Sequence, residues 1–170
     1  MSAATLARTA QAGKYLAFEL ARELYGVEIL RVQEITTAAG MRPVPGQPAC
    51  AAGVIRLRGR TIPVVSLRRR LGLSGPTPPG RACVVVVDVV SGTGVLAVGL
   101  LVDAVTEVCS FEAGAIDGPP GQGGGIEEGD WIAGIARAGD TSVCLIEVDR
   151  LLTRRERKQV ALIAGSAQAD

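Results

Sequence analysis

The sequence contains no histidine, and aromatic residues make up only 3% of its 170 residues. Histidine is the side chain that most often acts as a general acid or base near neutral pH, so catalysis by histidine is excluded. The scarcity of aromatics leaves no stacking platform for single-stranded nucleic acid. A net charge of +1 also gives no overall attraction to nucleic acid or to an anionic membrane. We therefore expect no nucleic-acid partner.

The familiar catalytic and phosphate-binding motifs are also missing. There is no Walker loop, no GxGxxG that follows a strand into a helix, and no GxSxG. The glycine run Gly121 to Gly125 lacks the Lys-Ser/Thr pair of a phosphate loop and is better explained as a flexible surface loop. The carboxylates Glu127, Glu128 and Asp130 lack the alternating oxygen ligands of a calcium loop. We expect no enzyme, no cofactor and no metal, although a small-ligand site in a barrel stays open as an alternative.

Cysteine usage indicates a reducing location. The four cysteines are far apart, form no CxxC pair and lie among small or apolar residues: Cys50, Cys83, Cys109 and Cys144. This pattern is typical of buried free thiols. The start, Met1 to Gly13, lacks the apolar segment of a signal peptide, so we expect a flexible tail over residues 1–13 and a cytoplasmic protein. An independent adaptor and a domain cut from a larger signalling protein both remain possible, and Met1 favours the first.

One stretch, Val84 to Val102, is apolar enough to suggest a membrane span. Asp88 interrupts it, and Ser91-Gly92-Thr93-Gly94 reads as a turn. The uncharged part after Asp88 is shorter than the roughly 20 residues that a spanning helix needs. Two buried strands explain the stretch better, and we expect no direct membrane insertion.

The remaining pattern indicates strands. Lys14 to Leu20 alternates apolar and polar residues, as a half-buried strand does, and Cys83 to Val89 is almost wholly β-branched, as in a strand buried on both faces. Further strands are expected at residues 25–30, 31–35, 53–57, 60–67, 94–101, 102–108, 132–136 and 142–148. A helix is predicted from near Arg150 toward Ile163, with Asp149 as its cap. Its apolar stripe would comprise Leu151, Leu152, Val160 and Leu162.

The two halves of the chain resemble each other. Lys14 to Ile35 and Ala82 to Val108 both read strand, turn, strand, and end in VQEI and VTEV. Gly53 to Leu67 resembles Gly134 to Val148 when one gap is placed opposite Arg58. The simplest explanation is an all-β protein of two similar small barrels that pack through a shared aliphatic core.

Arg58 stands out because that gap leaves it without a counterpart in the second half. Glu34 is the plausible countercharge, since early hairpins lie beside later strands. A bidentate arginine–carboxylate pair can fix the geometry of a partly buried site. The Glu34–Arg58 pair could be an ordinary structural ion pair, or it could shape a binding surface, and both can hold together.

Four segments together resemble the CheW family of bacterial chemotaxis coupling proteins. They are YLAFELARELYGVEILRVQEI, GVIRLRGRTIPVVSLRRRLGL, VGLLVDAVTEV and WIAGIARAGDTSVCLIEVDRLL. The resemblance covers Lys14 to Leu152, so we expect a CheW-like domain over residues 14–152 and a C-terminal helix and tail over 153–170. Two positions depart from the family: Arg56 stands where asparagine is common, and Ser66 where aspartate is common.

The resemblance implies two intertwined five-stranded barrels of the Src-homology-3 type and an adaptor function without catalysis. It implies three kinds of partner: the cytoplasmic tip of a methyl-accepting chemoreceptor, the regulatory domain of a CheA-type histidine kinase, and other CheW-like domains in receptor arrays. By position it makes Val32, Glu34, Gly53 and Arg58 candidates for receptor or kinase binding. It also implies that Leu101, Val102 and Val105 line an apolar groove that takes a receptor helix.

Overall fold

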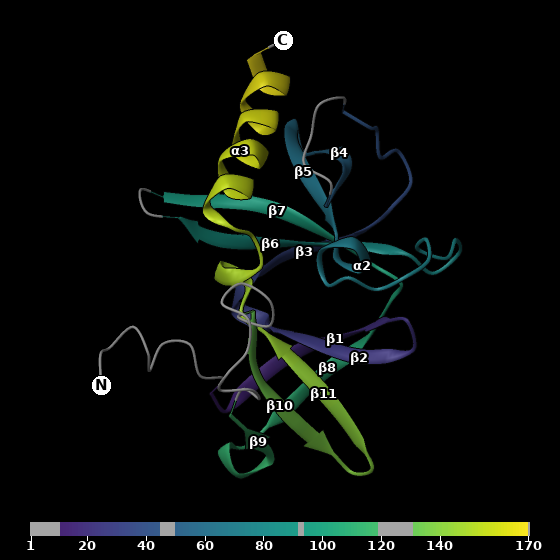
Figure 1. The fold of residues 1–170 in the computed structure, drawn as a ribbon, viewed down its shortest axis with the longest axis vertical. Helices are drawn as coiled ribbons and strands as arrows, with labels where there is room; N and C mark the ends of the chain where they lie inside the picture. Colours follow the sequence, from purple (N-terminus) through teal and green to yellow (C-terminus); the bar gives the residue numbers. More distant parts are fainter. Residues whose placement is uncertain (1–10, 45–49, 92–93, 119–130, 170) are drawn as a thin grey trace.

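Two curled β-sheets stack along the long axis of the protein, and one long helix, α3, stands beside the upper sheet (Figure 1). The computed structural model describes residues 11–44, 50–91, 94–118 and 131–169. The expected loop Gly121 to Gly125, the acidic residues Glu127, Glu128 and Asp130, and most of the expected N-terminal tail lie outside the described residues.

The lower sheet has six strands in the order β8-β1-β2-β11-β10-β9. Their bounds are β1 Gly13–Leu20, β2 Glu23–Glu28, β8 Ala104–Phe111, β9 Ile116–Asp117, β10 Ile132–Ala138 and β11 Thr141–Ile146. The upper sheet has five strands in the order β3-β6-β7-β5-β4. Their bounds are β3 Val32–Thr37, β4 Ala51–Leu57, β5 Arg60–Ser66, β6 Cys83–Ser91 and β7 Gly94–Val102. The all-β class with two intertwined barrels is confirmed; the two-residue strand β9 was not predicted.

The strand orders show how the repeated halves intertwine. The first half gives its β1–β2 hairpin to the lower sheet and β3, β4 and β5 to the upper one. The second half does the reverse: β6 and β7 join the upper sheet, and β8 to β11 form the lower one. In each sheet, one strand of the hairpin that the other half contributes pairs antiparallel with an edge strand: β1 with β8, and β6 with β3. The second strand of the hairpin pairs parallel with the last strand of the half that forms the rest of the sheet: β2 with β11, and β7 with β5. Neither barrel is complete without the other half of the chain.

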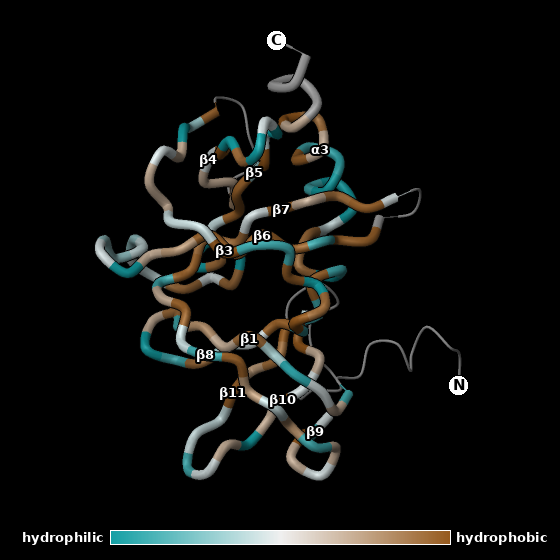
Figure 2. Tube along the Cα trace, turned by 180° about the vertical axis from the view of Figure 1, so that it is seen from behind, coloured by the Kyte–Doolittle hydropathy of each residue, from teal (hydrophilic) through white to brown (hydrophobic). Residues whose placement is uncertain are grey.

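The apolar residues divide into one shared core and two barrel cores. Along β6, Val85, Val87 and Val89 enter the shared core, while Val84 and Val86 enter the core of the upper barrel. Both faces of β6 are therefore buried, which explains its unbroken run of valines. Figure 2 shows hydrophobic segments in the strands of both sheets and hydrophilic ones on α3.

The C-terminal helix starts later than the sequence pattern indicated. α3 spans Arg154–Ala169. Its first turn is held by a capping box, in which Thr153 Oγ1 accepts from the Glu156 amide (3.1 Å) and Glu156 Oε1 accepts from the Thr153 amide (2.8 Å). The prediction that Asp149 caps the helix is wrong, because its carboxylate is engaged by Arg31. Val160 is buried in the shared core as predicted, but Leu162 is 69% exposed and was wrongly placed in the apolar stripe.

Two arginine–aspartate ion pairs join the two halves of the chain. Where one pair has its arginine, the other pair has its aspartate at the equivalent place in the other half. Arg31, just before β3, binds Asp149 after β11 through two bonds of 2.8 and 2.6 Å. Asp103, just before β8, binds Arg68 after β5, with Arg68 Nη2 2.6 Å from Asp103 Oδ2. Each carboxylate also accepts a hydrogen bond from a backbone N–H of the β6–β7 or the β1–β2 hairpin. Asp149 accepts from Val90, and Asp103 accepts from Ala21. These pairs fasten each hairpin to the barrel that it completes.

Candidate functional site

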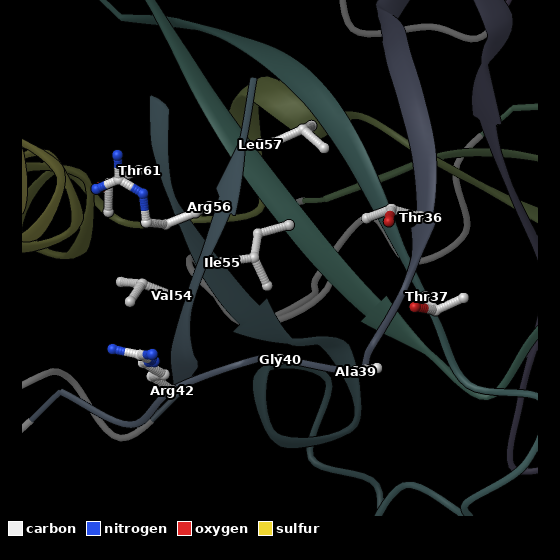
Figure 3. Close-up of a pocket in the computed structure, with 10 residues that line it drawn as sticks. All are labelled: Thr36, Thr37, Ala39, Gly40, Arg42, Val54, Ile55, Arg56, Leu57 and Thr61. Carbon is white, nitrogen blue, oxygen red and sulfur yellow. The ribbon is translucent and has the colours of Figure 1, made fainter. Parts of the chain in front are cut away.

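The upper barrel has an open seam between its two edge strands, β3 and β4. Two hollows lie along this seam. The larger, of about 410 Å³, lies between the end of β3 and the middle of β4 (Figure 3). The smaller, of about 240 Å³, is lined by Gln33 and Glu34 of β3 and by residues of the β4–β5 hairpin. We call this region the seam; it contains two of the predicted site residues, Glu34 and Arg58.

Glu34 and Arg58 approach each other across the seam. Arg58 Nε lies 3.1 Å from Glu34 Oε1, with the two side chains 79% and 28% exposed. This distance defines an ion pair, and it does not by itself show the bidentate geometry that the sequence suggested. An ion pair as exposed as this contributes at most about 1 kcal/mol to stability. Its main physical effect is to hold a positive and a negative group at a defined place on the rim.

The turn holds Arg58 in a left-handed backbone conformation, which costs free energy for a residue with a side chain. Arg58 has φ +53° and Gly59 has φ +79°, so both turn residues are left-handed. The ladders place Leu57 opposite Arg60 and Ala138 opposite Thr141, so both hairpins have two-residue turns. The gap that we placed opposite Arg58 is therefore wrong, and its counterpart is Gly139. Glycine would fit this turn at lower cost, so the turn itself does not require arginine.

Gly53 acts through its backbone. It lies in β4 at a shift of the β4–β5 register and has φ +151°. A Cβ at this position would lie 2.4 Å from the carbonyl oxygen of Arg42, too close for any side chain. Gly53 is buried, so it offers no side chain to a partner and instead allows Arg42 to pack against β4. A substitution here would displace the chain that borders the seam.

The apolar site residues are less accessible than the resemblance implied. Val102 has no exposed surface and belongs to the shared core, and Leu101 is 7% exposed in the core of the upper barrel. In this conformation Val102 offers no surface to a docked helix and Leu101 offers very little, and their place in a groove stays a prediction. Val32 and Val105 lie at equivalent positions of the two repeats and are partly buried against the shared core.

A second surface was missed by sequence reasoning. Leu30, Val90 and Val95 are 82%, 51% and 66% exposed. Val90 and Val95 face each other in the β6–β7 ladder, and Leu30 lies in the 3-10 turn η1 (Ile29–Arg31), which the Arg31–Asp149 pair holds against β6. We call these three residues the apolar patch. The sequence pattern placed Leu30 in a strand over residues 25–30, and only the missing alternation around Glu28 to Arg31 could have indicated otherwise.

The ionisable groups around these surfaces are structural in character. The hydrogen bond from Arg31 to Asp149 raises the pKa of the arginine. Burial raises the pKa of Glu147, which lies beside this pair. Burial, followed by the nearby Glu156, raises the pKa of Cys50 to about 11, and burial raises that of Cys144 to about 11. Both thiols are therefore protonated and weakly nucleophilic at neutral pH.

The cysteines and carboxylates of the described ranges do not gather into a metal site. Cys50 is buried as predicted, while Cys83, Cys109 and Cys144 are only partly buried, and all four are free. No group of three Cys, Asp or Glu side chains in the described part of the chain could hold a metal ion. Among the same residues, no helix is long and apolar enough to cross a membrane.

Comparison with known proteins gives a consistent picture. The CheW-like domain family model matches residues 14–156. The chain is 32% identical over 143 residues to chemotaxis protein CheW of Rhizobium meliloti, covering 84% of this chain and 89% of the relative. It is 27% identical over 144 residues to chemotaxis protein CheW of Treponema pallidum, covering 85% and 84%. The crystal structure of scaffolding protein TtCheW from Thermoanaerobacter tengcongensis is similar with a TM-score of 0.75 and 29% identity, covering 86% of this chain and 96% of that one.

Proposed function

Because the chain belongs to the CheW-like domain family of chemotaxis scaffold proteins, we propose that it couples chemoreceptor tips to the regulatory domain of a CheA-type histidine kinase. In this role it would work in the cytoplasm, in arrays at the membrane, and would carry out no catalysis. The observation that carries the proposal is the presence of two kinds of surface on one scaffold, the exposed aliphatic residues of the apolar patch and the charged rim of the seam. A coupling protein needs two such surfaces so that two partners can bind at once.

The apolar patch is suited to a barrel-to-barrel contact with the kinase. Its three side chains are large, aliphatic and exposed. The Arg31–Asp149 pair lies next to Leu30 in the chain, and Asp149 accepts a hydrogen bond from the backbone N–H of Val90. Exposed apolar groups with a charged rim are typical of protein interfaces. Each contact can be weak, because simultaneous binding in an array multiplies the effective affinity.

The seam is suited to a second contact, which depends on charge placement. Glu34 and Arg58 are held in position by β3 and by the left-handed turn. Val32 lies on the same strand as Glu34, and Gly53 fixes the opposite edge. We therefore assign Val32, Glu34, Gly53 and Arg58 to coupling, with Val32 and Gly53 acting mainly on the shape of the surface. Val105 borders the shared core at the equivalent place in the lower sheet.

The assignment of the apolar patch is tested by a pair of matched variants. Val95→Glu places a charge in the patch, and Leu162→Glu places the same charge on α3 at a similarly exposed apolar residue. Binding to the kinase regulatory domain, measured by calorimetry, should be lost in Val95→Glu and kept in Leu162→Glu. Equal binding of both variants would show that the patch is not the kinase surface. Failure of the unmodified protein to bind either the kinase domain or the receptor tip would refute the proposed function.

A further inference from the structure

The two barrels differ at one pair of equivalent positions on their outer edges. Arg56 lies opposite Thr61 in the β4–β5 hairpin, and Arg137 lies opposite Ser142 in the β10–β11 hairpin. Both arginines stand two residues before a two-residue turn, so they are structural equivalents. The residues two positions earlier, Val54 and Ile135, are equivalent for the same reason.

In the lower barrel this arginine has an acidic partner. The short strand β9 pairs with β10 so that Asp117 lies opposite Ile135. Asp117 thus sits diagonally from Arg137, and Arg137 Nη1 lies 2.7 Å from Asp117 Oδ2. The diagonal across this edge is therefore short enough for an ion pair.

In the upper barrel the acidic place is taken by a second arginine. Arg42 pairs with Val54 as Asp117 pairs with Ile135, through Arg42 N to Val54 O (2.9 Å) and Val54 N to Arg42 O (2.7 Å). Arg42 and Arg56 are consequently diagonal neighbours across this edge, as Asp117 and Arg137 are in the lower barrel, but both carry a positive charge. In Figure 3 both guanidinium groups extend to the same side of β4, away from Ile55 and Leu57. Both are exposed, and in the described residues neither is within ion-pair distance of a carboxylate.

Two adjacent cations without a countercharge attract an anion, and the larger seam hollow of about 410 Å³ borders both of them. We propose that Arg42 and Arg56 bind a carboxylate on an acidic segment of a partner protein. The segment approaches the exposed guanidinium groups beside the Arg42 segment, which already pairs with Val54 of β4. The lower barrel supplies the reason for choosing a peptide carboxylate, because a carboxylate is the group that neutralises Arg137, the equivalent of Arg56. The proposal does not depend on the kinase or receptor assignment, since it concerns a further partner segment.

The probe for this site can be taken from the chain itself. A synthetic peptide with the sequence of residues 110–118, SFEAGAIDG, carries the β9 strand and its aspartate. We expect weak binding to the full chain, seen in an NMR titration as shifts of the backbone amides of Val54 and Arg56. The same peptide with Asn in place of Asp117 should bind roughly five- to tenfold more weakly, because a charge-assisted hydrogen bond is lost.

Three variants of the protein complete the test. Arg56→Gln should weaken the binding of the aspartate peptide about fivefold, whereas Lys158→Gln, an equal charge change at an exposed residue of α3, should leave it unchanged. Arg42→Asp reproduces the lower barrel, so it should abolish peptide binding and raise the melting temperature by about 1–3 °C through a new pair with Arg56.

The proposal would be overturned by equal shifts with the Asp and Asn peptides, by equal losses in Arg56→Gln and Lys158→Gln, or by no shifts at millimolar peptide. Shifts of the same amides with inorganic phosphate or a single-stranded oligonucleotide, and none with the aspartate peptide, would also overturn it in favour of a phosphate site. None of these outcomes bears on binding to the kinase domain, so the two proposals fail separately.

Discussion

Arg58 and Gly139 occupy equivalent positions in two hairpin turns of equal length, and both are left-handed, with φ +53° and +65°. The second hairpin uses the residue that fits this conformation at least cost. The first uses an arginine whose side chain reaches Glu34 on a neighbouring edge strand. Arg58 thus accepts a conformational cost in its backbone and places its charge at the rim of the seam, which supports the binding role proposed for it.

The first prediction concerns Arg58→Gly. Removing left-handed strain should stabilise the turn by about 0.5–1 kcal/mol, and losing an exposed ion pair should cost a similar amount. The melting temperature should therefore stay within about 3 °C of the parent. Binding to the partner at the seam should weaken, as measured by calorimetry. Glu34→Gln serves as the matched variant, because it removes the same pair without changing the turn. Unchanged binding in both variants would exclude the pair from coupling.

Gly53→Ala should destabilise the protein. The added Cβ would stand 2.4 Å from the carbonyl oxygen of Arg42 at a φ of +151°, so the backbone of β4 or of Arg42 must shift. We expect a loss of more than about 2 kcal/mol in the free energy of unfolding, measured by urea titration. Gly114→Ala is the control, since a Cβ there meets nothing within 4 Å. Equal stability of the two variants would contradict the packing described for Gly53.

The Arg68–Asp103 pair predicts a pH dependence. Burial raises the pKa of Asp103, but the hydrogen bonds from Arg68 and from the Ala21 amide outweigh it, so the net pKa lies below the usual 3.8. A lowered folded-state pKa gives stability that is present above the unfolded pKa and lost as the pH falls through the folded value. Asp103→Asn should therefore cost about 1.5–3 kcal/mol at neutral pH, and the difference from the parent should shrink below about pH 4.

The control for this prediction is Asp117→Asn. It removes the exposed Arg137–Asp117 pair, whose side chains are both 57% exposed, compared with 11% for Arg68 and Asp103. Its effect on the free energy of unfolding should be below about 1 kcal/mol. Urea unfolding at several pH values measures both variants. A constant difference between Asp103→Asn and the parent from neutral pH to pH 2 would contradict the assignment.

Cysteine reactivity should separate the four thiols. Cys50 is 5% exposed, and its pKa of about 11 leaves almost no thiolate at pH 7.5. The partly buried Cys83 should react first with a thiol reagent, and Cys50 should react at a comparable rate only in the unfolded protein. Mass spectrometry after timed alkylation, with Cys83→Ser as the control, measures the order. Rapid labelling of Cys50 in the folded state would show that its packing under α3 is wrong.

Most strands could be predicted because their signals are local. The valine run of β6 indicated a strand with both faces buried, and Val84 and Val85 do enter different cores. The start of α3 was missed because Asp149 is a good cap in isolation, and Arg31, 118 residues away, determines its actual role. Thr153 and Glu156 have the spacing of a capping box, which is a local signal for a helix that starts at Arg154.

The site could be predicted less completely than the strands. The comparison of the two halves and the family resemblance both singled out Arg58 with Glu34, and the fold places them within contact distance. It could not show that Val102 is buried, because apolar residues of core and groove look alike in sequence. Local sequence patterns also could not predict that the two halves exchange hairpins. The exchange depends on which sheet edge each hairpin pairs with, and that is decided by residues far apart in the sequence. The apolar patch follows from that exchange, because β6 and Asp149 meet only in the assembled fold.

The central claim is that this chain bridges two partners. It is tested most directly by reconstitution with the cognate kinase regulatory domain and a receptor-tip fragment, followed by size-exclusion chromatography. Kinase domain and receptor fragment should elute together only when this protein is added. Separate elution of the two partners in its presence, at concentrations where each is folded, would show that this protein does not bridge them.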